Sequence, residues 1–193
     1  MFEHATISMV GAKGGAGKTA LTIALAAEAT HRGMRVMVGD ADPNGVALKW
    51  ARLASHLGNP APAHALGLDE KLRVQVPRWR GGYDLTLLDT AGDLDKRVGA
   101  ALAVSDIVLL PVKPETSDIW VLSKTIKVVQ QAQALAQAEL PSMRTVLRAT
   151  KQYTEAQDVG LGITTAFPRT DKADELRALL DELIALEESR HAA

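Results

Sequence analysis

The most constraining feature of the sequence is a glycine-rich segment that connects a short apolar run to a helical stretch. Residues 11–19 read GAKGGAGKT, which satisfies the pattern G-x-x-x-x-G-K-[ST]. An apolar run at residues 6–10 precedes it, and apolar residues recur at helical spacing over residues 21–27. This order of strand, loop and helix is typical of a phosphate-binding loop, because glycines let backbone N–H groups surround phosphate oxygens at a helix N-terminus. The alternative, a glycine-rich turn that binds nothing, is disfavoured by the strand and helix on either side.

The side chains of this loop predict its chemistry. Lys18 is placed to bridge the β and γ phosphates of a nucleotide, and the hydroxyl of Thr19 is placed to bind Mg²⁺. We therefore expect Mg²⁺ with ATP, or with ADP after hydrolysis, to be held by this one segment, namely by Gly11, Gly14, Gly15, Ala16, Gly17, Lys18, Thr19 and Ala20.

Short apolar runs alternate with helical stretches along the rest of the chain. Further strands are predicted at residues 34–38, 85–88, 107–112 and 145–147, and helices at 47–57, 94–104, 121–138 and 171–188. Parallel strands need crossover connections, so this alternation predicts a doubly wound α/β fold of the P-loop NTPase kind, with a mainly parallel sheet and helices on both faces. We expect a single domain over residues 1–193, with a long surface loop at 59–67. The final helix carries leucines along one stripe and is expected to pack on the body of the domain.

Composition excludes several classes of function. The sequence has no cysteine, which excludes disulfides, thiolate metal sites, Cys-ligated iron–sulfur clusters and a cysteine nucleophile. The 22 Lys and Arg against 23 Asp and Glu give a net charge of −1, so a contact with nucleic acid or an anionic membrane needs a local basic patch. No apolar run approaches the ~20 residues of a membrane span, and the N-terminus lacks a signal-peptide pattern. We expect a soluble cytoplasmic protein without stable membrane insertion.

A second lysine lies five residues before Lys18. The segment KGGAGKT, which begins at Lys13, resembles the deviant Walker A motif of the ParA/MinD family, K-G-G-x-G-K-[ST]. The resemblance implies that Lys13 of one subunit contacts the nucleotide of its partner, so that ATP holds a homodimer together. It also implies that Lys13 and Lys18 both act in ATP hydrolysis. The alternative is that Lys13 is a solvated charge of the loop.

Two further segments extend this resemblance. Residues 34–44 read MRVMVGDADPN, which looks like the family's D-x-D-P-Q segment with asparagine in place of glutamine. By resemblance Asp42 is the catalytic residue that positions or activates the attacking water, while Asp40 helps to hold the Mg²⁺ shell. Two capping acids at a strand-to-helix turn remain the alternative, above all for Asp40. The segment YDLTLLDTAGD resembles the Walker B strand, which implies that Asp89 holds a Mg²⁺-bound water and that Gly92 responds to loss of the γ-phosphate.

The resemblance runs from about residue 7 to about residue 147 and becomes weaker after that. The segment IVLLPVKP looks like the family's strand-and-proline segment, which places Pro114 near the base, although its prolines equally suit an ordinary loop. Thr150 and Lys151 are further candidates beside the base. Residues 150–169 are too few for the strand and helix that members usually carry there, which leaves adenine specificity open.

The resemblance implies a ParA-like partition ATPase. Hydrolysis would be weak alone and stimulated by a ParB-like or other cargo adaptor, and the ATP dimer would bind nonspecific DNA and associate with the nucleoid. In the absence of an N-terminal DNA-reading domain, sequence-specific autorepression is not expected. Nonspecific DNA binding needs clustered basic residues, and the candidates are Arg78 and Arg80 around Trp79, Lys124, Lys127, Arg144, Arg148 and Lys151. Each of them alone is more typical of a solvated face.

Two other functions stay open. One is a MinD-like, membrane-associated regulator of the division site; the acidic polar face of the final helix counts against it. The other is a metabolic P-loop enzyme that acts on a small acid; Lys13 and the D-x-D-P segment count against that class.

Overall fold

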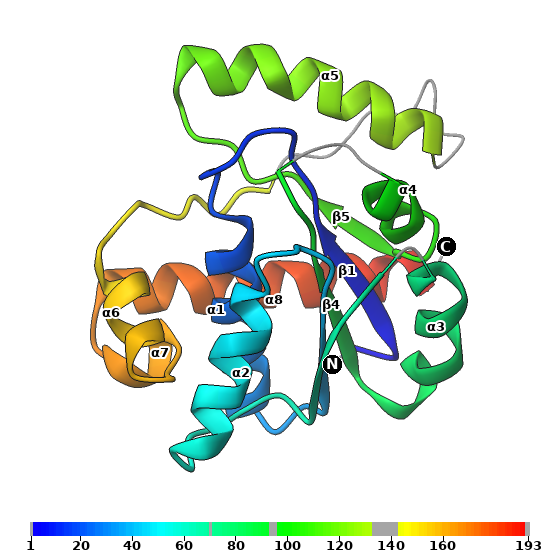
Figure 1. Cartoon of the computed structure of the whole chain (residues 1–193). Coiled ribbons are helices and arrows are strands. Elements are labelled where there is room, and N and C mark those ends of the chain that lie inside the picture. Colours follow the sequence, from blue (N-terminus) through cyan, green and yellow to red (C-terminus); the bar gives the residue numbers. More distant parts are fainter. Residues whose placement is uncertain (1, 70, 93–95, 133–142, 192–193) are drawn as a thin grey trace.

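The computed structural model describes residues 2–69, 71–92, 96–132 and 143–191. A five-stranded sheet lies at its centre, made of β1 (Ala5–Met9), β2 (Val36–Asp40), β3 (His64–Gly67), β4 (Leu85–Asp89) and β5 (Ile107–Leu109). The strands follow the order β3-β2-β4-β1-β5, and each pair of neighbours is parallel (Figure 1). This arrangement confirms the predicted doubly wound α/β fold.

Helices form a layer on each face of the sheet (Figure 1). One layer packs around the larger apolar cluster and contains α1 (Lys18–His31), α2 (Val46–His56), α6 (Gln152–Asp158), α7 (Ile163–Ala166) and α8 (Asp171–His191). The other layer packs around two smaller clusters and contains α3 (Leu72–Trp79), the 3-10 turn η1 (Arg80–Gly82), α4 (Lys96–Leu102) and α5 (Thr116–Ala132). Because the helices cover both faces, the loops at the ends of the strands are left to form sites.

The central strands are buried on both sides. Every residue of β1, β2 and β4 is buried, and side chains alternate between the two layers. Leu87 packs with the cluster around α1 and α8, whereas its neighbour Leu88 packs with the cluster around α3 and α4. The pairing register places Asp89 opposite both Met9 and Asp40. The carboxyl ends of β1, β2 and β4 therefore lie level, and the loops that follow them meet at one edge of the sheet.

The final helix packs on the body of the protein, as its leucine stripe predicts. Leu176, Leu180 and Leu183 are each 0% exposed in the core cluster around α1 and the sheet. The apolar face of α8 is thus occupied by the protein's own core. None of the helices in the described ranges combines the length and the hydropathy needed to cross a membrane.

The edge strand β3 is not predicted from the sequence. β3 falls inside the expected surface loop at residues 59–67, where it pairs with β2 alone and leaves most of its residues exposed. An edge strand of four residues needs no apolar run, so its sequence, HALG, carries little strand pattern.

The predicted strand at residues 145–147 is wrong. Residues 143–150 run as an irregular segment, and carboxylates of α8 bind its backbone N–H groups where a strand would bind a neighbour. Glu182 accepts from the N–H groups of Arg144 at 2.7 Å and Thr145 at 3.0 Å, and Glu175 accepts from the N–H of Arg148 at 2.9 Å. These bonds satisfy three backbone donors of the segment without a sheet.

The remaining helices differ from prediction in number and in extent. α3, α6 and α7 occur where no helix is predicted, and α3 contains Pro77. The predicted helix at 121–138 corresponds to α5, whose start lies earlier; its predicted end lies outside the described residues. The predicted start of the helix at 94–104 lies outside them as well, and α4 ends at Leu102, before the predicted end at residue 104.

Candidate nucleotide-binding site

The loop between β1 and α1 has the backbone geometry of an anion-binding loop. Gly15 and Gly17 have φ angles of +78° and +96°, in the left-handed region that favours glycine. α1 begins at Lys18 with Gly17 as its N-cap. Because glycine has no side chain with which to cap the first turn, the N–H groups there can bind an anion, and the helix dipole favours a negative charge at this end.

An open cleft with a volume of about 610 Å³ lies beside this loop. A cavity of that size suits a nucleotide-sized ligand. Three segments that are far apart in the sequence line it, namely Ala12, Gly14, Gly15, Gly17, Lys18, Thr19 and Ala20 of the loop and α1, Asp42 and Asn44 after β2, and Gly92 after β4. The cleft therefore lies at the carboxyl ends of the strands, where α/β folds bind ligands.

Lys18 lines the cleft and is held in place by the loop. Its side chain is only 6% exposed, and Nζ donates hydrogen bonds to the backbone carbonyls of Gly11 and Lys13, each at 3.2 Å. The side chain therefore curls around the loop that precedes it. This position puts an ammonium charge where the loop and the start of α1 offer their N–H groups.

Asp89 ends β4 and is fully buried beside Thr19. The hydroxyl of Thr19 donates to Oδ2 of Asp89 at 2.7 Å, and the hydroxyl of Thr22 donates to Oδ1 at 3.2 Å. Burial raises the pKa of the Asp89 carboxyl to about 7, with a further rise from the charges of Asp40 and Asp42; the two threonine hydroxyls oppose this shift. Thr22 was missed by sequence reasoning, although it lies one helical turn after Thr19 on the same face of α1.

These residues fit a bound Mg²⁺. The hydroxyl of Thr19 lies at the wall of the cleft, 2.7 Å from Oδ2 of the buried Asp89, and a hard divalent cation prefers oxygen ligands. A positive charge here would also offset the unfavourable burial of the Asp89 carboxylate. In the described part of the chain, no group of three or more His, Cys, Asp or Glu side chains forms a metal cage.

Asp40 and Asp42 do different work in the loop after β2. Asp40 is 2% exposed; its two oxygens accept the backbone N–H of Asp42 at 3.1 Å and of Leu48 at 2.9 Å. Burial raises the pKa of the Asp40 carboxyl, and these backbone hydrogen bonds oppose the rise. Asp42 lines the cleft instead, with Oδ1 accepting the N–H of Asn44 at 2.8 Å. Asp40 thus anchors the loop and the first turn of α2, and its part in the Mg²⁺ shell stays a prediction.

Gly92 brings the loop after β4 against the phosphate-binding loop. A Cβ atom at this position would lie 3.1 Å from the backbone N of Gly14 and 3.3 Å from its Cα. The absence of a side chain therefore permits a direct backbone contact between the two loops. Because the two loops are in contact, a movement of one loop would displace the other. This coupling suits the predicted response of Gly92 to the γ-phosphate.

Lys13 lies outside the lining of the cleft. Together with Gly11 and Ala16 it lines a separate hollow of about 20 Å³ against Leu110, Pro111 and Val112, and its Nζ lies 3.5 Å from Oε2 of Glu115. Its side chain is 38% exposed. The two lysines of the motif therefore occupy different places, since Lys18 is in the cleft and Lys13 faces the segment after β5.

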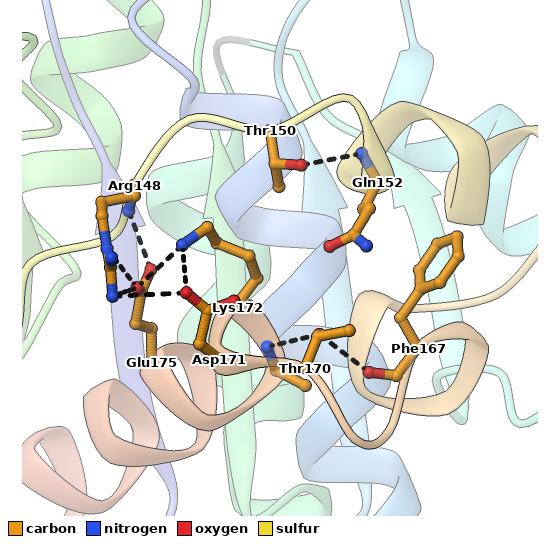
Figure 2. A network of polar contacts seen from close by, with 9 residues as sticks. Arg148, Thr150, Gln152, Phe167, Thr170, Asp171, Lys172 and Glu175 are labelled. Carbon is orange, nitrogen blue, oxygen red and sulfur yellow. Dashed lines mark hydrogen bonds and ion pairs between the residues drawn. The ribbon is translucent and has the colours of Figure 1, made fainter.

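The three candidates for the base are not among the residues that line the cleft. Pro114 is exposed in the segment after β5, and Lys151 is the exposed N-cap of α6. Figure 2 shows Thr150 beside Gln152, whose backbone N–H donates to its hydroxyl at 3.3 Å. Contact of these residues with the base stays a prediction.

Asp89 should make the stability of the metal-free, nucleotide-free protein depend on pH. Its carboxyl has a pKa of about 7 in the folded protein and near 4 in the unfolded chain, so between these values only the folded protein keeps the proton. The free energy of unfolding should therefore fall as pH rises from about 4 to 7, by up to roughly 4 kcal/mol from this group. Asp89→Asn should remove that part of the decline.

Urea unfolding in EDTA at pH 5 and pH 8 measures this effect. The difference between the two pH values should be smaller in Asp89→Asn than in the wild type. The exposed acid Asp158, changed to Asn, serves as the control and should leave the difference unchanged. An equal difference in wild type and Asp89→Asn would contradict the proposed titration.

Comparisons with known proteins show which family the chain resembles. Residues 7–174 match the family described as the CobQ/CobB/MinD/ParA nucleotide binding domain. The chain is similar to the maintenance of carboxysome distribution protein A of Halothiobacillus neapolitanus, at 31% identity over 129 residues, 66% of this chain and 59% of that protein. It is also similar to the protein ParA of Rhizobium radiobacter, at 23% identity over 129 residues, 65% of this chain and 56% of the relative. The similarity thus spans little more than half the length of these relatives.

Solved structures of the same fold cover nearly the whole chain. The apo McdA structure from Cyanothece superimposes with a TM-score of 0.74 at 13% identity, covering 93% of this chain and 99% of the other. The septum site-determining protein MinD of Pyrococcus horikoshii, complexed with Mg-ADP, gives a TM-score of 0.73 at 20% identity, with 93% and 95% covered. At these identities the structures establish the shared fold, while the family match covers the residues that form the cleft. The chain therefore belongs to the CobQ/CobB/MinD/ParA family of nucleotide-binding domains.

Proposed function

We propose that this chain is a ParA-like ATPase that positions a plasmid, a chromosome region or a protein cargo. ATP would hold two copies together as a homodimer, and the dimer would bind DNA without sequence preference. A ParB-like or other adaptor protein would stimulate hydrolysis and release the subunits. The similarity of the chain to a carboxysome distribution protein and to a ParA protein supports this class of function.

The observation that carries the proposal is the different placement of the two lysines around one cleft. Lys18 lines the cleft together with Asp42 and with Thr19, whose hydroxyl donates to the buried Asp89, and this arrangement supports nucleotide binding and hydrolysis. Lys13 lies outside the cleft lining and is partly exposed. This placement supports a contact of Lys13 with a nucleotide held by a second subunit, and so a dimer built around ATP.

The residues in and next to the cleft would each have a specific role in ATP hydrolysis. The N–H groups at the start of α1 and the Lys18 ammonium would hold the phosphates. Mg²⁺, when bound, would neutralise charge on the β- and γ-phosphates. Thr19 and Asp89 would hold that ion. Asp42 would orient a water molecule toward the γ-phosphorus, and Asp40 would fix Asp42 by accepting its backbone N–H.

Hydrolysis by this set of residues should be slow in the isolated chain. Water attacks the γ-phosphorus, the bond to the bridging oxygen of ADP breaks, and inorganic phosphate leaves. Catalysis of this transfer depends on positive charge around the transferred group. Within one subunit, Lys13 is paired with Glu115 and does not line the cleft. The additional positive charge would come from Lys13 of a second subunit, so an isolated subunit lacks it.

The candidate DNA-binding residues differ in their contacts within the subunit. Arg80 pairs with Asp106 at 2.7 Å, and Arg148 pairs with Glu175 at 2.6 Å. These two arginines are engaged with acidic residues of their own subunit. Arg78, Lys124, Lys127, Arg144 and Lys151 have exposed side chains, and Lys124 and Lys127 lie three residues apart on α5. We propose that this lysine pair contributes to the DNA surface of the dimer.

Binding to random-sequence duplex DNA tests the proposal. Fluorescence anisotropy with ATP, with ADP and without nucleotide should give binding only with ATP, and the affinity should fall steeply as salt rises. Lys124→Ala combined with Lys127→Ala should weaken binding and lower the salt slope, because each phosphate contact contributes about 0.9 to it. ATP-dependent dimerisation should be unchanged in this variant.

Two outcomes would contradict the proposal. Equal DNA binding in all nucleotide states would separate the DNA contact from the nucleotide switch. No binding in any state would favour a different partner, and vesicle binding and assays with small acids would then test the two alternative functions. The burial of the α8 leucine stripe already argues against this helix as a membrane anchor.

A further inference from the structure

An ion pair joins the phosphate-binding loop to the start of α5. Nζ of Lys13 lies 3.5 Å from Oε2 of Glu115, with the side chains 38% and 57% exposed. Glu115 directly precedes α5 (Thr116–Ala132), and Leu122 and Thr125 of that helix line the same hollow as Lys13. The pair therefore lies on a contact between two elements that are about 100 residues apart in the sequence.

Glu115 and a nucleotide phosphate would compete for the same ammonium. Neither Lys13 nor Glu115 is among the residues that line the cleft of their own subunit. To reach a nucleotide in a second subunit, Lys13 has to turn from the Glu115 carboxylate toward the phosphates. The carboxylate would then lie close to an incoming triphosphate, and like charges at short distance repel each other.

We propose that Glu115 is a positioning residue that holds Lys13 within its own subunit in the nucleotide-free monomer and opposes ATP-dependent dimerisation. The inference rests on the proposed function, because it requires Lys13 to act on the partner's nucleotide. Both effects of the carboxylate have the same sign: it stabilises Lys13 in the monomer, and it repels phosphates in the dimer. The Glu115 carboxylate thus sets how much ATP and protein are needed before the dimer forms.

The partly exposed setting of the pair limits the size of this effect. Exposed ion pairs contribute little to stability because water and salt screen them. Removal of the Glu115 charge should therefore tighten the ATP-bound dimer by about two- to fivefold, not by orders of magnitude. Because the ion pair with Glu115 is weak, Lys13 can readily leave this carboxylate and bind the phosphates of the second subunit's nucleotide.

Three variants separate the charge of Glu115 from its packing. Glu115→Gln keeps the shape of the side chain and removes the charge, whereas Glu115→Asp keeps the charge. Glu155→Gln removes an exposed acid from the first turn of α6 and serves as the matched control. Sedimentation velocity with Mg²⁺ and a non-hydrolysable ATP analogue gives the dimer dissociation constant of each protein. Binding of a fluorescent ATP analogue at low protein concentration gives the affinity of the monomer.

Glu115→Gln should dimerise about two- to fivefold more tightly than the wild type, with a smaller difference at high salt, and its monomer should bind ATP as the wild type does. Glu115→Asp and Glu155→Gln should match the wild type. A Glu115→Gln dimer that is no tighter than the wild type would overturn the inference. If the wild type itself forms no dimer with the analogue, the proposed function fails first, and the inference fails with it.

Discussion

Asp42→Ala should slow ATP hydrolysis by about 100-fold or more while the ATP-bound homodimer persists. A positioned carboxylate that acts on the attacking water typically contributes a factor of this size. Asp42 lines the cleft, and its Oδ1 accepts the N–H of Asn44, so the loop holds the carboxylate in one orientation. The substitution leaves in place Lys18, which is expected to bind the phosphates, and Thr19, which is expected to bind Mg²⁺. The loss should therefore fall on the hydrolytic step and not on nucleotide binding.

A second substitution distinguishes chemistry from loop structure. Asp42→Asn keeps an oxygen that can accept the N–H of Asn44 but removes the carboxylate charge, and it should also be slow. The control is Asp69→Ala, because Asp69 is an exposed acid whose Oδ1 accepts the N–H of Lys71 at 2.7 Å in a similar local turn. Phosphate release assays give the rates, and sedimentation with ATP gives the dimer. Normal hydrolysis by Asp42→Ala, or a variant that stays monomeric with ATP, would reject the assigned role.

Lys13→Ala should abolish the ATP-dependent dimer and leave nucleotide binding by the monomer nearly unchanged. Removal of one partner from a buried, charged interface contact weakens association by about 2 kcal/mol or more, which is at least about 30-fold. The monomer should be spared because Lys13 is outside the lining of its own cleft. Hydrolysis should fall with the dimer, since one subunit alone lacks the added positive charge.

The matched control for this substitution is Lys71→Ala, which removes an exposed lysine at the start of α3. It should dimerise as the wild type does. Lys18→Ala should instead lose nucleotide binding in the monomer, which separates the two lysines by their readouts. If Lys13→Ala dimerises normally with ATP, Lys13 is a solvated charge of the loop and the dimer must be held by other contacts.

Sequence reasoning succeeded for elements whose pattern is contained in a few adjacent residues. The buried strands β1, β2 and β4 are short segments made mainly of apolar residues. The glycine-rich loop carries its phosphate-binding geometry in its own glycines, with φ of +96° at Gly17. The leucine stripe of α8 likewise predicts a buried face, and Leu180 is 0% exposed. In each case the local spacing of side chains and the required backbone angles decide the outcome.

Prediction failed where the partner of a segment lies far away in the chain. Residues 145–147 have the composition of a strand, but Glu175 and Glu182 of α8 bind the backbone there instead of a neighbouring strand. β3 is an edge strand that owes its existence to pairing with β2 and not to apolar residues. Local pattern cannot reveal either arrangement, because both depend on which elements become neighbours after folding.

The sequence by itself determined the fold class, the phosphate-binding loop and the family resemblance, because these depend on short motifs and on the order of strands and helices. Only the tertiary structure decided how the site residues are distributed. The parallel register brings Asp89 beside Asp40, and the packing of α1 lets the Thr22 hydroxyl donate to Asp89. Asp42 lines the cleft, whereas Lys13 pairs with Glu115 outside the cleft lining. These pairings join residues as far as 102 positions apart, and only the packing of strands and helices sets the distances between their side chains.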